Sequence, residues 1–183
     1  MHRYGIFAVL TVIVVTAFFF VARARAADDA TPLAVGSEAP GFTLPSQENK
    51  QVSLSDFKGK WVVLYFYPKD MTHGCTIEAH NFQRDQAKYD AAGAAIVGVS
   101  MDTAESHQSF CTKENLTFRL LADPEHKVVD LYHVPVNGAM GIHYASRWTY
   151  LISPQGKIVK VWTKVDVDTH SDEVLAAIAA GKS

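Results

Sequence analysis

Seven consecutive apolar or aromatic residues, Trp61 to Tyr67, constrain the fold of this chain more than any other stretch. The run is rich in residues that favour β-structure, and it is bounded by Gly59 and Pro68. A run of this length and composition predicts a strand that is buried on both faces. Strands of that kind occur in sheets that are covered on both sides, so the run indicates a layered α/β domain.

A polar loop follows this strand, and a cysteine stands where the next helix should begin. At that place Cys75 faces the unpaired backbone N–H groups and the positive end of the helix dipole. Both stabilise the thiolate, which is the reactive form of cysteine. We therefore interpret the stretch from Tyr65 to His80 as the candidate active site.

Periodicity and turn residues predict the remaining elements. In chain order these are short strands at 42–44 and 51–54, a helix at 75–92 ended by Gly93, a strand at 94–100, a helix at 103–115, a strand at 118–122, a short helix at 125–132, a loop at 134–146, a hairpin of strands at 148–152 and 157–163, and a helix at 169–180. This order predicts a thioredoxin-like α/β fold, with a central mixed β-sheet flanked by helices.

The N-terminus carries an apolar segment, residues 6–21, followed by a small-x-small pattern that ends at Ala26. This pattern predicts that residues 1–26 are a signal peptide cleaved after Ala26. The alternative is an uncleaved anchor helix that holds the domain at the membrane, facing the periplasm. In either case we expect an exported protein, in a bacterial periplasm. Turn-rich residues 27–41 are interpreted as a linker, and residues 35–183 as the folded domain.

Composition and charge narrow the function classes. The 183 residues include 48% hydrophobic and 20% charged residues, which suffices for one domain with a core. The net charge is −2 and no basic stripe occurs, so there is no electrostatic case for binding nucleic acid.

Only two cysteines are present, Cys75 and Cys111. An oxidising compartment permits a disulfide between them, either as a structural link or as a redox-active pair. His73 and His80 flank Cys75 at spacings that occur in zinc sites, but no second ligand pair accompanies them. We therefore predict no metal site and no cofactor.

Three separated segments resemble the peroxiredoxins. Pro68 to Cys75 matches the signature Pro-x-x-x-Thr-x-x-Cys, and its surroundings, Tyr-Phe-Tyr-Pro-Lys-Asp and Gly-Cys-Thr-x-Glu, resemble the bacterioferritin comigratory protein (peroxiredoxin Q) branch. Arg147-Trp-Thr-Tyr resembles the family's Arg-x-Thr-Phe segment. The similarity runs from about Val35 to Ala180. It implies a thiol peroxidase of antioxidant defence that reduces hydrogen peroxide and organic hydroperoxides. It also implies a thioredoxin-like dithiol reductant as partner and a monomeric state.

The resemblance also implies roles for individual residues, and each role suits the chemistry of peroxide reduction. They are Cys75 as the peroxidatic nucleophile, Thr72 as a hydroxyl beside the sulfur, Pro68 as a shield against bulk water, Arg147 as a cation that stabilises the thiolate and binds peroxide oxygens, Gly74 as a source of backbone N–H donors, and Glu78 as a support for the arginine.

The resolving cysteine departs from the commonest pattern of the branch. That pattern places it five residues after the first cysteine, where this chain has His80. Other members carry it on the next helix, where Cys111 falls. The resemblance thus implies a Cys75–Cys111 disulfide during turnover. Because a disulfide needs Cα atoms within about 7 Å, local unwinding at both sites is expected.

Two alternatives stay open. A thiol–disulfide oxidoreductase would normally carry Cys-x-x-Cys, but the position three after Cys75 is Glu78. A metal-binding module of the same fold would need paired ligands near the first helix, which the sequence barely supplies.

Overall fold

The computed structural model describes residues 30–139 and 141–181. From Pro32 onward they belong to one folded unit. The predicted signal peptide or anchor, residues 1–26 with cleavage after Ala26, lies outside the described residues. Among the residues that are described, no helix is long and apolar enough to cross a membrane.

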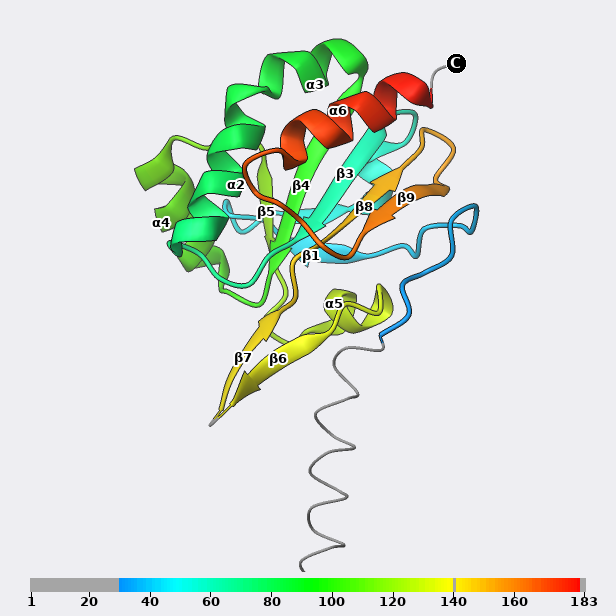
Figure 1. Cartoon of the computed structure of the whole chain (residues 1–183). Helices are drawn as coiled ribbons and strands as arrows, with labels where there is room; N and C mark the ends of the chain where they lie inside the picture. Colours follow the sequence, from blue (N-terminus) through cyan, green and yellow to red (C-terminus); the bar gives the residue numbers. More distant parts are fainter. Residues whose placement is uncertain (1–29, 140, 182–183) are drawn as a thin grey trace, which may run out of the picture. The chain divides into compact units, whose positions relative to one another are not determined.

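A mixed five-stranded sheet forms the centre of the unit, in the order β5-β4-β3-β8-β9 (Figure 1). Its strands are β3 (Trp61–Phe66), β4 (Ala94–Ser100), β5 (Arg119–Ala122), β8 (Trp148–Ile152) and β9 (Ile158–Trp162). β3 is parallel to β4 and antiparallel to β8. Every residue of β3 is buried, as its apolar run predicts. The predicted central mixed sheet is confirmed.

Four helices cover one face of this sheet (Figure 1). They are α2 (His73–Arg84), α3 (Gln86–Ala92), α4 (Ala104–Glu114) and α6 (His170–Ala180). Tyr65 of β3 and Tyr67, which directly follows the strand, share a buried cluster with side chains from all four helices. The two cysteines, Cys75 on α2 and Cys111 on α4, belong to the same cluster. The fold therefore places both thiols on one side of the sheet.

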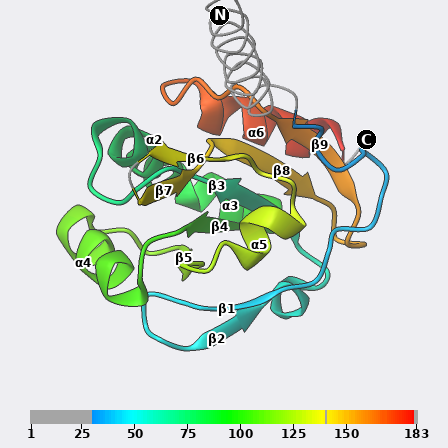
Figure 2. The ribbon, with the colours of Figure 1, turned by 90° about the horizontal axis from the view of Figure 1, so that it is seen from below.

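The opposite face is covered by aromatic side chains and short elements. Phe66 of β3 contacts the rings of Tyr132 and Tyr150, and Tyr132 follows the short helix α5 (Lys127–Leu131). A small hairpin, β1 (Thr43–Pro45) and β2 (Gln51–Ser53), is followed by the 3-10 helix η1 (Leu54–Phe57). β1 lies beside β5, where Ser46 bridges to Leu121 (Figure 2).

The predicted single helix at 75–92 is wrong, because the structure has two helices there. α2 ends at Arg84, and Asp85 joins it to α3 with φ −95° and ψ 6°. The carboxylate of Asp85 accepts hydrogen bonds from Arg84, Lys88 and the hydroxyl of Ser171 on α6. Contacts with a distant helix thus stabilise the break.

The predicted loop at 134–146 is also wrong, because it contains a hairpin of β6 (Val136–Ala139) and β7 (Ile142–Ala145). Gly138 permits this pairing: a Cβ at that position would lie 1.9 Å from the carbonyl oxygen of Ile142. Most of the hairpin is exposed or half-buried, so it lacks the apolar alternation that marks a strand.

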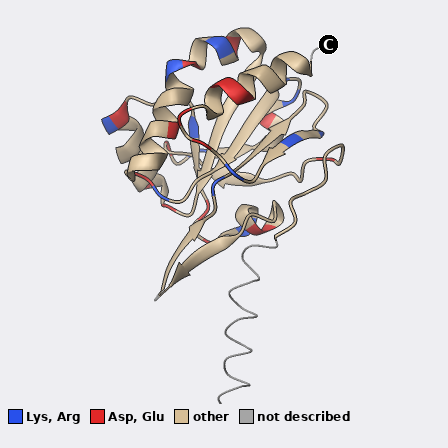
Figure 3. Cartoon of the chain, in the orientation of Figure 1, with Lys and Arg blue, Asp and Glu red and all other residues tan. Residues whose placement is uncertain are grey.

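The segment 36–39 is shared by the predicted linker and the predicted domain, and it is part of the folded unit. Gly36 N donates to the carbonyl of Ile158 at 2.7 Å, and Ala39 N donates to that of Gly156 at 2.8 Å. Acidic and basic residues are interspersed along the helices and loops of the unit (Figure 3).

Candidate active site

Cys75 is the third residue of α2, where backbone N–H groups have no partners within the helix. The side chain is 2% exposed and the thiol is free. Thr72 is the N-cap residue, but its hydroxyl makes no capping hydrogen bond. It donates instead to the carbonyl of Lys69 at 2.9 Å. The N–H groups around Gly74 and Cys75 are therefore not engaged by a capping side chain.

Arg147, from a distant part of the chain, also contacts the sulfur. It lies between β7 and β8, and its Nη2 atom is 3.3 Å from Cys75 Sγ. A Cβ at position 74 would lie 3.4 Å from this Nη2 atom, so Gly74 leaves the room that the guanidinium occupies. A fixed cation therefore contacts the sulfur at the positive end of α2, and both favour negative charge on it.

Glu78, one turn further along α2, pairs through Oε2 with Nη1 of Arg147. It is 1% exposed, and burial raises the pKa of its carboxyl to about 7 although Arg147 opposes this shift. Burial alone would lower the pKa of Arg147, but the charges of Glu78 and Cys75 hold it above the usual value. The guanidinium thus stays charged while it is held between a carboxyl and a sulfur.

Thr72 and Pro68 frame the loop before α2. Pro68 is half-buried just after β3, and Thr72 is exposed. Because the Thr72 hydroxyl donates its proton to Lys69, its oxygen can only accept from a further ligand. An exposed hydroxyl that accepts and a guanidinium that donates are the two partners that a hydroperoxide, R–O–O–H, requires.

Cys111 lies on α4, is 8% exposed and is free. Burial, with a smaller effect from the Asp70 carboxylate, raises the pKa of its thiol to about 12. The structure therefore brings Cys75, Gly74, Glu78 and Arg147 into direct contact, and leaves Cys111 as a protonated thiol in the same core. The role predicted for Cys111 stays a prediction.

Sequence reasoning gave no role to Asp70 and His107, which form a buried pair beside the site. The available signal was that His107 precedes Cys111 by one helical turn. Among the described residues, no group of three His, Cys, Asp or Glu side chains is arranged to hold a metal ion. His80 pairs instead with Glu114 of α4, at 2.9 Å.

Comparisons with known proteins agree with this geometry. The profile of the AhpC/TSA family matches residues 35–161. The chain is 42% identical over 147 residues to peroxiredoxin Bcp of Bacillus subtilis, covering 79% of this chain and 94% of that protein. It is 40% identical to peroxiredoxin Bcp of Escherichia coli, with the same coverage of both chains.

Solved structures give the same result. The chain superposes on a mutant of PrxQ of Xylella fastidiosa with a TM-score of 0.78 and 31% identity, over 84% of this chain and 99% of that one. It superposes on peroxiredoxin Q of Xanthomonas campestris with a TM-score of 0.72 and 37% identity, over 78% and 92%. Mutants of the Xanthomonas protein at either of two cysteines also have known structures and are similar to this chain.

Proposed function

This chain belongs to the AhpC/TSA family, in its Bcp (peroxiredoxin Q) branch, and on that premise we propose that Cys75 is the nucleophile of its peroxidase reaction. The enzyme is an antioxidant thiol peroxidase that uses a thioredoxin-type reductant. One observation carries the assignment of Cys75: its sulfur lies at the start of a helix, 3.3 Å from the guanidinium of Arg147. Among the described residues, burial and the Asp70 carboxylate act on the Cys111 thiol, and neither favours its thiolate.

In the first step the Cys75 thiolate attacks one peroxide oxygen. An S–O bond forms and the O–O bond breaks, so the sulfur is oxidised to sulfenic acid and the peroxide is reduced to water or an alcohol. Arg147 donates to the peroxide oxygens as charge develops on the leaving one. Thr72 accepts the peroxide O–H, and backbone N–H groups at Gly74 and Cys75 add further donors.

In the second step Cys111 condenses with the sulfenic acid to give a Cys75–Cys111 disulfide and water. The two mutated cysteines of Xanthomonas campestris peroxiredoxin Q are separated by the same number of positions as Cys75 and Cys111, which supports this pairing. The dithiol reductant then reduces the disulfide and becomes oxidised itself. Because the pKa of Cys111 is about 12 while it is buried, the thiol must leave its present surroundings before it attacks.

The test follows peroxide consumption with thioredoxin as reductant, and the fate of each thiol after one equivalent of peroxide. We expect Cys75→Ser to abolish consumption, and Cys111→Ser to react once without forming an intramolecular disulfide. Mass mapping under non-reducing conditions should find Cys75 linked to Cys111 in the wild type. Full activity in Cys75→Ser would contradict the role of Cys75. An intermolecular link, or a Cys111 thiol left free, would contradict the role of Cys111.

We also propose that the enzyme is exported through residues 1–26 and acts in the periplasm as a monomer. The family match begins only at residue 35, and the relative from Bacillus subtilis is covered to 94% while a fifth of this chain stays unmatched. Protein recovered from a periplasmic fraction should begin at Ala27 and sediment as a monomer. Recovery from membranes with Met1 intact would favour the anchor instead.

A further inference from the structure

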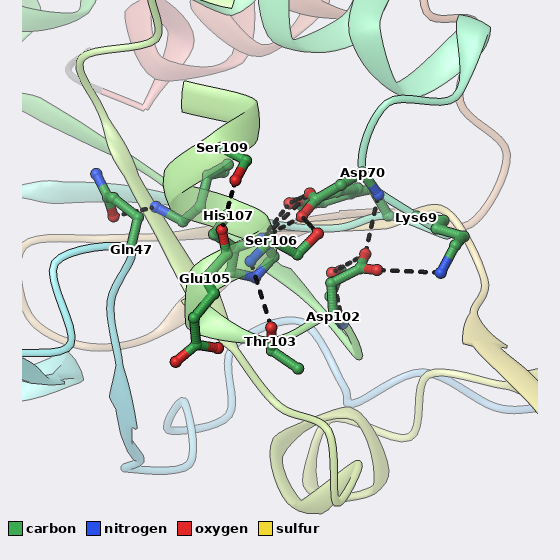
Figure 4. Close-up of polar contacts among 12 residues, drawn as sticks. Gln47, Lys69, Asp70, Asp102, Thr103, Glu105, Ser106, His107 and Ser109 are labelled. Atoms are coloured by element: carbon green, nitrogen blue, oxygen red, sulfur yellow. Dashed lines mark hydrogen bonds and ion pairs between the residues drawn. The ribbon is translucent and has the colours of Figure 1, made fainter. Parts of the chain in front are cut away.

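Asp70 and His107 connect the segments that carry the two cysteines (Figure 4). Asp70 lies in the loop between β3 and α2, five residues before Cys75, and is 5% exposed. His107 lies on α4, one turn before Cys111, and is 0% exposed. His107 Nδ1 is 2.8 Å from Oδ2 of Asp70. The pair therefore joins the two parts that disulfide formation must rearrange.

Several hydrogen bonds hold the two members of this pair in place. His107 Nε2 lies 3.1 Å from the carbonyl oxygen of Leu121, which can only accept, so Nε2 carries a proton. The Asp70 carboxylate accepts from the hydroxyls of Tyr67 and Ser106, both at 2.7 Å, and these bonds favour its ionised form. Nδ1 of His107 faces this carboxylate away from water, so a charge-assisted hydrogen bond holds the two side chains together.

The pKa of Asp70 agrees with an ionised carboxylate. Burial would raise it, but the hydrogen bonds from His107, Ser106 and Tyr67 outweigh burial and lower it. When one partner of a buried ion pair is removed, the other is left as an uncompensated charge, which is strongly destabilising. Removing His107 should therefore weaken the contact between the loop and α4, because the Asp70 carboxylate loses its buried partner.

Weaker ties support the same contact. Asp102 accepts the backbone N–H of Asp70 at 2.9 Å and pairs with exposed Lys69 at 3.3 Å. The exposed side chain of His80 on α2 pairs with Glu114 at the end of α4. Exposed pairs of this kind contribute little, so the buried pair dominates.

The closed pair also determines the state of Cys111. His107 and Cys111 share the buried face of α4, so α4 cannot turn Cys111 outward while His107 is held. Burial and the Asp70 charge both keep the Cys111 thiol protonated. A protonated thiol does not attack a sulfenic acid, since the thiolate is the nucleophile.

We propose that the Asp70–His107 pair is a latch whose opening releases α4 and lets Cys111 reach the oxidised Cys75. This inference rests on the proposed roles of the two cysteines. After opening, the Cys111 thiolate bonds to the Cys75 sulfur, the S–O bond of the sulfenic acid breaks, and the oxygen leaves as water. Asp70 and His107 touch no substrate. They are positioning residues for this second step.

A closed latch exposes Cys75 to further oxidation. While Cys111 is held away, a second peroxide can oxidise the Cys75 sulfenic acid to sulfinic acid, and that peroxide is reduced to water or an alcohol. The latch thus determines how sulfenic acid divides between disulfide and sulfinic acid. Loosening it should favour the disulfide.

The first test measures latch opening without any peroxide chemistry. In Cys75→Ser protein, Cys111 is the only thiol, so its reaction rate with the chromogenic disulfide DTNB reports its exposure. We expect His107→Asn to speed this reaction about tenfold, because a charge-assisted hydrogen bond is lost. His107→Asn leaves the Asp70 charge in place, so a faster reaction cannot come from removing that charge.

Ser106→Ala is a milder variant that keeps the ion pair, and it should accelerate the reaction less, in the same direction. Each variant has a matched control. Ser109→Ala removes a hydroxyl of the same helix that donates only to the Glu105 carbonyl. His170→Asn replaces another buried histidine, bonded to Thr149. Controls should leave the rate unchanged. Unchanged rates in both latch variants, or equal acceleration in the controls, would overturn the proposal.

The second test compares the two reaction steps with both cysteines present. In His107→Asn the disulfide should form about tenfold faster after peroxide addition, with less sulfinic acid at any peroxide concentration. A purely structural role would not raise the ratio of disulfide to sulfinic acid. Slower or unchanged disulfide formation would overturn the proposed latch. If the wild type forms no Cys75–Cys111 disulfide, the resolving role of Cys111 is wrong. The DTNB rates still decide separately whether Asp70 and His107 control its exposure.

Discussion

Arg147 and Cys75 are 72 positions apart in the sequence, yet the guanidinium Nη2 lies 3.3 Å from the sulfur. The sheet produces this contact. Phe66 at the end of β3 pairs with Trp148 at the start of β8, so the loop leading to Cys75 leaves the sheet beside Arg147. The pairing of β3 with β8 therefore positions the Arg147 guanidinium beside the sulfur, and it holds Arg147 more rigidly than a free loop would.

This geometry predicts that Arg147→Gln lowers kcat/KM for hydrogen peroxide about 10²- to 10³-fold, the usual loss when one donor to a developing charge is removed. Arg147→Lys should recover only part of the activity. A lysine ammonium has a single nitrogen atom and lacks the planar fork with which Nη1 reaches Glu78 and Nη2 reaches the sulfur. Stopped-flow measurement of the first oxidation step checks both variants.

Arg119→Gln is the matched control, because Arg119 is a partly exposed arginine that pairs with Glu48 away from the sulfur. It should leave kcat/KM unchanged. Equal losses in the Arg119 and Arg147 variants would show that the contact with Cys75 is not what matters.

Removing the hydroxyl of Tyr65 and removing that of Tyr67 should change the stability of the fold in opposite directions. The Tyr65 hydroxyl is buried and has no hydrogen-bond partner among the described residues, whereas Tyr67 donates to Asp70 at 2.7 Å. An unsatisfied buried polar group costs about 1–3 kcal/mol. Tyr65→Phe should therefore raise the free energy of unfolding by about 1 kcal/mol, and Tyr67→Phe should lower it by a similar amount. Urea titrations measure both, and changes of the same sign would contradict the argument.

Much of the fold could be predicted from local sequence. The apolar run at 61–67 identified β3 because a strand buried on both faces needs no polar positions. The strand pair at 148–152 and 157–163 was found because a turn signal, Ser-Pro-Gln-Gly, separates two runs of β-forming residues. Cys75 was predicted to stand at a helix start after a buried strand, and the structure places it in the first turn of α2; its role as nucleophile stays a prediction.

The features that escaped prediction depend on contacts between distant residues. The break at Asp85 is stabilised by Ser171, 86 positions away, while the local helical pattern continues across it. The β6–β7 hairpin is exposed over much of its surface, so no alternation marks its strands. Asp70 and His107 lie 37 positions apart, and either alone is an ordinary polar residue. Only the fold makes them a pair.

Met71, in the loop before Cys75, has a φ of 61°, which residues other than glycine, asparagine and aspartate rarely adopt. At two other left-handed positions, 49 and 115, the chain has asparagine. Met71→Asn should therefore stabilise the fold by about 1 kcal/mol. Chemical denaturation of the reduced protein checks this, with Met71→Leu expected to gain nothing. A loss of stability in Met71→Asn would show that the Met71 side chain contributes more than its backbone costs.

The buried His170 should make the free energy of unfolding depend on pH. It is buried on α6, and burial lowers its pKa to about 4, from about 6.5 in an unfolded chain. Between these values the unfolded chain binds a proton that the folded protein does not. Stability is therefore complete above pH 6.5 and falls as the pH drops toward 4, by about 1.4 kcal/mol per pH unit.

His170→Gln removes this titration and can keep a hydrogen bond to Thr149, so its free energy of unfolding should fall less steeply between pH 6.5 and 4. Urea titrations at several pH values measure the two slopes. His126→Gln, at an exposed histidine, should keep the slope of the wild type. An equally steep loss of stability between pH 6.5 and 4 in His170→Gln would mean that other groups cause the loss. Glutamine has no titratable proton, so it cannot contribute to this pH dependence.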